Sequence, residues 1–195
     1  MNKSLKSNIY YPPGGILIWI IILIELLTFG MAIITFLISS HNELNIFHES
    51  RLLLNIRIGS CNTLVLIISG YCIAKAVNYY KESNLFKFSF SIKLTVFFGS
   101  LFIVLKCIEY YYKINDNLLI DTNTFFTFYW MLTAFHLIHV IVGLVILVTV
   151  YFKYINKPQS ISIYDIEASA AFWHMCDLIW LLIFPLLYLF SYNEK

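Results

Sequence analysis

Five apolar runs, each long enough to cross a lipid bilayer, constrain this chain more than any other feature. They cover approximately residues 16–39, 59–80, 90–112, 125–152 and 168–190. A helix of about 20 apolar residues spans the ~30 Å hydrocarbon core of a bilayer. The chain is 60% hydrophobic and only 12% charged, about half the charged fraction of a soluble domain. We therefore predict an all-α integral membrane protein with a single membrane domain over residues 1–195, a bundle of five transmembrane helices.

Lysines and arginines are distributed unevenly between the two ends of this predicted bundle. If successive helices alternate in direction, the N-terminal side collects eight of them, Lys3, Lys6, Lys75, Lys81, Lys87, Lys93, Lys153 and Lys157. The other side collects five, Arg51, Arg57, Lys106, Lys113 and Lys195. Positive charge favours the cytoplasmic side of a membrane. We therefore expect a cytoplasmic N-terminus and an external C-terminus. The net charge of +2 is too small to indicate a nucleic-acid partner.

Ionisable residues interrupt three of the apolar runs at a common depth. Counted from the predicted helix ends, Glu25 and Asp177 lie about 13 Å from one membrane face and His136 about 16 Å from the other. His139 and His174 fall about one helical turn away, so the five are predicted to form an intramembrane polar cluster. Such groups are costly inside a bilayer and usually have a partner or a function. We expect at least two of Glu25, His136 and Asp177 to face one another inside the bundle.

These residues leave more than one function open. His139 and His174 lie at similar depth, which is the arrangement of a haem held between two helices in a redox enzyme. Glu25, His136 and Asp177 are also residue types that a proton-coupled transporter uses, although neither the repeats nor the broken helices of transporters are visible. The spacing of His136 and His139 is a weak metal motif because such pairs arise often by chance. We predict that the chain holds no metal and has no catalytic residue.

Several motifs resemble those of subunit III of haem–copper oxidases. In the last run, Glu167-Ala168 and Phe172-Trp173-His174-Met175-Cys176-Asp177-Leu178-Ile179-Trp180 are similar to that family's final helix. Thr124-Phe125-Phe126 and the stretch from Leu132 to Gly143, which includes His136 and His139, are similar to the preceding helix. Further matches are Asn62-Thr63-Leu64 with Ser69-Gly70, the pair Glu109-Tyr110, and Glu25, which falls at the family's intramembrane glutamate. The resemblance extends from Pro13 to Tyr188, although Lys106 stands where the family more often has a neutral residue.

The resemblance implies a non-catalytic accessory subunit of a terminal respiratory oxidase in a bacterial plasma membrane. Such a subunit binds no haem or copper, because the partner subunit holds them. It packs against catalytic subunit I and subunit II, binds phospholipid, and supports aerobic electron transport and proton uptake. The longest members have seven helices, of which this chain matches the last five. Five-helix forms also occur in a branch associated with nitric oxide reductase, which is the alternative. Either cytochrome c or a quinol would suit as the oxidase's electron donor.

Overall fold

The computed structural model describes residues 12, 14–156 and 160–189, and within these it contains six α-helices and no strand. The helices are α1 (Ile16–Asn42), α2 (Leu44–Leu52), α3 (Ile56–Lys81), α4 (Leu85–Asn115), α5 (Thr124–Asn156) and α6 (Ile163–Phe184), and α6 continues into a wider turn, η2 (Pro185–Leu189). Five of them are long and apolar enough to cross a membrane. The predicted all-α bundle of five transmembrane helices is therefore confirmed. Pro13 and four residues used to predict the orientation, Lys3, Lys6, Lys157 and Lys195, lie outside the described residues.

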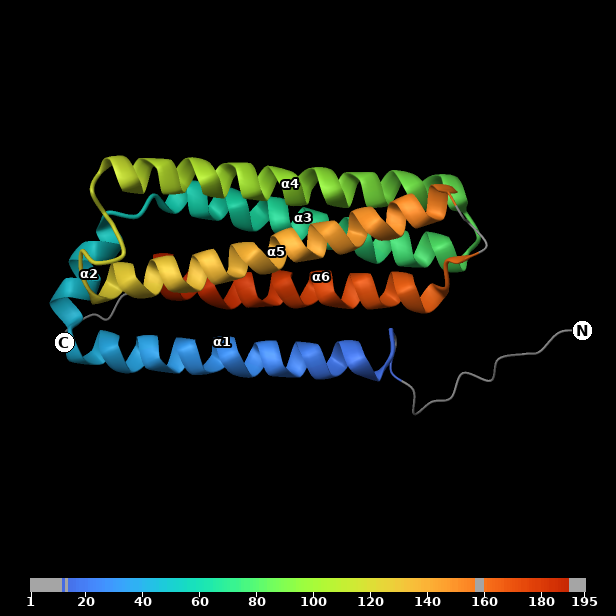
Figure 1. Cartoon of the computed structure of the whole chain (residues 1–195). Coiled ribbons are helices and arrows are strands. Elements are labelled where there is room, and N and C mark those ends of the chain that lie inside the picture. Colours follow the sequence, from blue (N-terminus) through green and yellow to red (C-terminus); the bar gives the residue numbers. More distant parts are fainter. Residues whose placement is uncertain (1–11, 13, 157–159, 190–195) are drawn as a thin grey trace, which may run out of the picture.

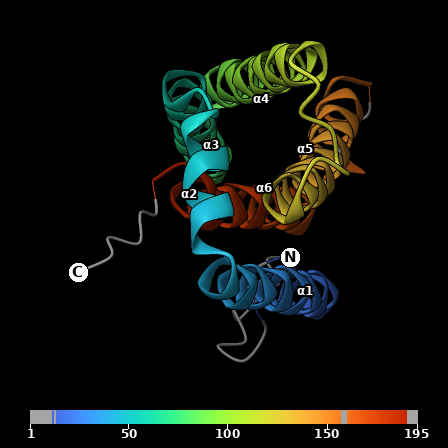
Figure 2. The same cartoon turned by 90° about the vertical axis from the view of Figure 1, so that its left-hand side faces the viewer.

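Four of the long helices form the body of the molecule, and the fifth lies beside it. Seen along the helices in Figure 2, α3, α4, α5 and α6 stand at the corners of a square. Helix α1 lies outside this square and contacts α6 and α5 (Figure 1). The short α2 crosses one end of the molecule between α1 and α3 (Figures 1 and 2). We call this end, which also carries the loop 116–123 between α4 and α5, the α2 end.

Helix α6 is the centre of the fold and α1 its periphery. In their most apolar segments, 56% of the residues are buried in α6, including η2, against 6% in α1. Helix α6 contacts α1, α3 and α5, whereas α1 touches the bundle along one narrow side. Two tryptophans of α6, Trp173 and Trp180, are among the largest fully buried side chains. The polar residues of α6 consequently lie among three neighbouring helices, whereas most of the surface of α1 is not covered by the rest of the chain.

The helices extend further than the apolar runs because polar caps close their ends. The side chain of Asn55 accepts hydrogen bonds from the backbone at the start of α3, and Asn84 does the same for α4. Ser162 and Asp165 form a reciprocal capping box at the start of α6. After α3, Ser83 adopts the left-handed conformation that commonly ends a helix. The helices therefore continue past the hydrocarbon-length runs into the membrane interface.

Helix α2 lies in a segment predicted from the sequence only as a polar connection, residues 40–57. It is positioned by Phe47, whose ring lies 5.1 Å from that of Phe36 on α1 and 5.5 Å from that of Phe125 on α5. One turn later, Ser50 accepts a hydrogen bond of 2.8 Å from the side chain of Asn123, which precedes α5. Two ring contacts and one hydrogen bond thus fix α2 across the end of the bundle.

Candidate functional site

Glu25 and His139 connect α1 to α5 in the middle of the molecule. The carboxylate Oε2 of Glu25 lies 3.0 Å from Nε2 of His139. The other ring nitrogen, Nδ1, donates to the carbonyl oxygen of Phe135 at 2.8 Å. Because a carbonyl only accepts, Nδ1 carries a proton and Nε2 is the ring nitrogen that faces the carboxylate. His139 is therefore held from both sides, by its own helix and by α1.

His174 and Asp177 form a second pair, within α6. Nδ1 of His174 lies 3.4 Å from Oδ2 of Asp177. Helix α3 approaches this carboxylate closely at Gly70, where an added Cβ atom would lie 2.2 Å from Oδ2. The other carboxylate oxygen of Asp177, Oδ1, is buried and has no hydrogen-bond partner among the described residues. This pair thus sits where α6 and α3 pack most tightly.

His136 is buried between aromatic rings and does not join either pair. Its ring stacks on Trp180 with centroids 5.2 Å apart and meets the edge of Phe102 at 5.8 Å. Neither ring nitrogen has a hydrogen-bond partner among the described residues. The indole N–H of Trp180 donates to the hydroxyl of Thr63 on α3 at 3.0 Å. His136 and Trp180 together fill the space between α3, α4 and α5.

Trp173 fills a similar space one layer away, between α4 and α5. Two glycines make room for its indole, since an added Cβ would lie 2.6 Å from it at Gly99 and 2.9 Å at Gly143. The indole N–H is buried without a partner among the described residues. Glu167, the first residue of the matched motif of α6, instead forms an ion pair of 2.8 Å with Lys81 at the end of α3. Trp173 therefore packs α6 against α4 and α5, and Glu167 joins α6 to α3.

The structure consequently divides the predicted cluster into separate contacts. The five residues lie on three helices as expected, but Glu25 contacts His139, Asp177 contacts His174 and His136 contacts aromatic rings. The expectation that two of Glu25, His136 and Asp177 face one another is therefore wrong. The two histidines of the haem alternative are also apart, because His139 contacts Glu25 and His174 contacts Asp177. Among the described residues, no group of three or more histidine, cysteine or acidic side chains has a metal-binding arrangement.

A buried cluster that the sequence did not predict surrounds Lys106 on α4. The ammonium donates to Oε2 of Glu109 at 3.0 Å, to the hydroxyl of Tyr188 at 3.2 Å and to that of Tyr129 at 3.4 Å. The two hydroxyls in turn donate to the other oxygen of Glu109, Oε1. All three ammonium protons thus have an acceptor, and both carboxylate oxygens have a donor. Both Lys106 and Glu109 are fully buried.

Aromatic rings complete the surroundings of this ammonium. Its nitrogen lies between 5.0 and 5.7 Å from the ring centroids of Tyr110, Tyr129, Trp180 and Tyr188. Rings at this distance attract a cation through their quadrupoles. From the sequence, Lys106 lies within the run 90–112 and counts with the charges of the external side, whereas its side chain is fully buried in the bundle. A signal was present nonetheless, since Lys106 and Glu109 are three residues apart on one helix, the spacing of neighbours on one face.

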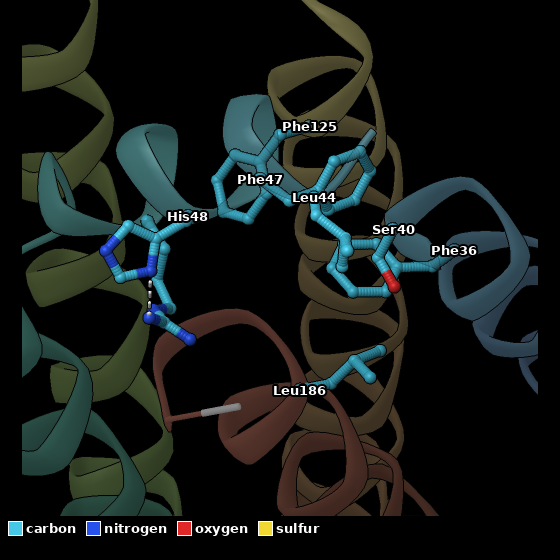
Figure 3. Close-up of a pocket in the computed structure, with 8 residues that line it drawn as sticks. Phe36, Ser40, Leu44, Phe47, His48, Phe125 and Leu186 are labelled. Carbon is cyan, nitrogen blue, oxygen red and sulfur yellow. Dashed lines mark hydrogen bonds between the residues drawn. The ribbon is translucent and has the colours of Figure 1, made fainter. Parts of the chain in front are cut away.

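A small pocket lies at the α2 end, beside α2 itself. Figure 3 shows aromatic and aliphatic side chains around it from α1, α2, α5 and η2, among them Phe36, Phe47 and Leu186. At one edge His48 points toward Arg51, which donates to its ring nitrogen at 3.3 Å. The pocket is therefore apolar with a cationic edge, and none of the five intramembrane residues lines it.

Comparison with known proteins identifies the family. The family model described as "Cytochrome c oxidase subunit III" matches residues 15–192. The chain belongs to the cytochrome c oxidase subunit III family. The matched residues include all five helices that are long and apolar enough to cross a membrane.

Individual relatives in the subunit III family cover this chain to different extents. Cytochrome bo(3) ubiquinol oxidase subunit 3 of Buchnera aphidicola from Schizaphis graminum is 25% identical over 88% of this chain and 91% of that protein. Cytochrome c oxidase subunit 3 of Rhipicephalus sanguineus is 32% identical over 65% of this chain but only 49% of that protein. That of Spodoptera frugiperda is 31% identical over 65% of this chain and 85% of that protein. The chain thus spans about half the length of the tick subunit.

Proposed function

We propose that this chain is a non-catalytic accessory subunit of a haem–copper terminal oxidase that packs against the catalytic subunit. The observation that carries the proposal is the subunit III family match over residues 15–192. The polar residues of the bundle support it, because His139, Lys106 and Glu109 are engaged by one another or by neighbouring side chains and so serve the fold of the chain. The relatives reported above are named as oxidase subunits, so the nitric oxide reductase alternative is not favoured.

The same proposal extends to cofactors and location. Haem and copper belong to the partner, catalytic subunit I with subunit II, and none is bound by this chain. The chain lies in a bacterial plasma membrane with its N-terminus in the cytoplasm. Because Lys106 is buried in the bundle, it is removed from the charges counted at the external side, which strengthens this orientation.

Phospholipid is the second proposed partner. The pocket at the α2 end is apolar within and cationic at its edge, where Arg51 and His48 lie. The apolar lining suits a few methylene groups of an acyl chain, and the phosphate of the headgroup complements the cationic edge. The exposed side of α1 offers further apolar surface to the same lipids.

Purification from native membranes tests the accessory role. The tagged chain, extracted in mild detergent, should retain a large haem-bearing subunit and oxidase activity. Recovery of the chain alone and colourless, from membranes with active oxidase, would contradict the proposal.

A second measurement tests the cofactor assignment. The chain separated from its partners should show no Soret absorption and no stoichiometric iron or copper. A haem spectrum in the separated chain that is lost in His139→Ala or His174→Ala would instead establish the redox alternative.

A further inference from the structure

His174 differs from the other intramembrane ionisable residues in its exposure. Its side chain is 46% exposed, whereas the side chains of Glu25 and His139 are 23% and 11% exposed. It lies about 17 Å along α6 from Ile163, which places it at mid-depth in the membrane. A polar side chain that faces lipid at this depth is strongly disfavoured. The surface around His174 is therefore unsuited to be covered by acyl chains.

The pair of His174 and Asp177 also has hydrogen-bonding capacity that this chain does not use. Nδ1 of His174 faces the carboxylate of Asp177, which leaves Nε2 with no partner among the described residues. Oδ1 of Asp177 is buried without a partner in the same part of the chain. Two polar atoms of this pair are thus without a hydrogen-bond partner among the described residues, Nε2 of His174 at the surface and Oδ1 of Asp177 beneath it.

The apolar residues around this pair form a face that a helix can pack against. Leu178 follows His174 by one turn on α6 and is exposed. Across the close approach at Gly70, helix α3 presents Ile67 and Tyr71, which are also exposed and one turn apart. A small residue at a helix contact lets the two backbones approach closely, so α3 and α6 present these side chains as one continuous surface. This face thus has the polar His174 at its centre and exposed apolar side chains around it.

We propose that the α3–α6 face around His174 is where a transmembrane helix of the catalytic oxidase subunit packs, and that this helix carries a hydroxyl or carboxamide side chain at mid-membrane depth. Nδ1 of His174 faces Asp177, so Nε2 is the ring nitrogen left for a partner, and it accepts when unprotonated and donates when protonated. A hydroxyl or a carboxamide serves in both cases, whereas an acyl chain serves in neither. The identity of the partner rests on the proposed function, while the choice of face rests on His174 alone.

Site-specific photo-cross-linking in native membranes tests the face. A benzophenone amino acid is placed at Leu178, and the matched control is Leu23, an exposed residue of similar type at mid-depth on α1. We expect the Leu178 probe to join the haem-bearing subunit and the Leu23 probe to give mainly lipid adducts. The assignment is overturned if the Leu178 probe gives only lipid adducts or if the haem-bearing subunit is joined mainly from Leu23.

Two substitutions test the hydrogen bond itself. His174→Leu should weaken retention of the chain by the oxidase in mild detergent about threefold to tenfold, the range of an interhelical hydrogen bond in a membrane, and His174→Gln should restore most of it. The thermal stability of the separated chain in detergent is measured for both variants, because it reports the loss of the intrachain contact with Asp177 separately from the loss of the partner. Equal retention of His174→Leu and the unmodified chain would overturn the inference.

The two proposals fail in different ways. If the haem-bearing subunit co-purifies but cross-links only through Leu23, the accessory function stands and the face is wrong. If no haem-bearing subunit co-purifies and the Leu178 probe joins a different membrane protein, the proposed function fails while the face is still an interface.

Discussion

Replacement of Lys106 by methionine is the most informative perturbation of the bundle. The change keeps the apolar stem and removes the ammonium that contacts Glu109 at 3.0 Å. Loss of one partner of a buried ion pair costs about 3–5 kcal/mol, because the other charge is left uncompensated. Here the hydroxyls of Tyr129 and Tyr188 still donate to the carboxylate. We therefore expect a loss near the lower end, about 3 kcal/mol in the free energy of unfolding.

Substitution of the other partner, Glu109, and the double substitution complete a thermodynamic cycle. Glu109→Gln leaves a buried ammonium with only neutral acceptors and should cost about 3–5 kcal/mol. When both changes are made, no charge remains and the amide oxygen of the new glutamine still accepts from both tyrosines. The double variant should therefore lose only about 0–2 kcal/mol. The coupling between the two positions is accordingly about 4 kcal/mol or more, well above that of exposed pairs.

The assay is reversible unfolding of the separated chain in mild detergent, followed by its helical circular dichroism. Lys75→Met is the matched control, because Lys75 is a partly exposed lysine on α3 whose ammonium lies 5.5 Å from the ring of Tyr71. That control should cost less than about 1 kcal/mol. Additive effects of the two changes, or a Lys106→Met variant as stable as the Lys75→Met control, would refute the reasoning.

Two further predictions concern the contacts of α1 and α3. Glu25→Leu should leave Nε2 of His139 without its partner and cost about 1–3 kcal/mol, whereas Glu25→Gln should retain the contact. Spin-label distances between α1 and α5 in detergent should broaden only in the leucine variant. Gly70→Ala should clash with the carboxylate of Asp177 and cost about 1–3 kcal/mol, while Gly30→Ala, which meets no atom within 4 Å, should leave the melting temperature unchanged. Equal melting temperatures for the two alanine variants would contradict the close approach at Gly70.

The number of long helices and their alternating direction follow from the sequence, because crossing a bilayer depends on the length and hydropathy of each apolar run. Their ends are less accessible, since caps such as Asn55 and Ser162 extend helices beyond the apolar runs. Helix α2 could not be predicted from its own composition. Its position depends on Phe47 meeting rings from α1 and α5, which are contacts between segments distant in the chain.

The depth of a side chain along a helix was predictable, but its direction around the helix axis was not. Glu25 lies within reach of α5, yet the helix rotation brings it to His139 and not to His136. Lys106 shows the same limit. Its place in the last part of the predicted run 90–112 suggests a side chain that extends to water, but its direction around the helix axis turns it into the bundle. It is buried because Tyr129 and Tyr188, from α5 and η2, supply its acceptors. Those partners become visible only once the helices are packed.

The pairing of Lys106 with Glu109 inside one helix bears on how the chain is made. Helix α4 is synthesised before α5 and η2, so it enters the membrane before Tyr129 and Tyr188 are available. A lone lysine in that helix would oppose insertion by about 2.5–3.5 kcal/mol near the membrane centre. Its carboxylate neighbour one turn away neutralises this charge within the same helix. The hydroxyls of Tyr129 and Tyr188 complete the hydrogen bonds of the pair only when α5 and η2 pack against α4.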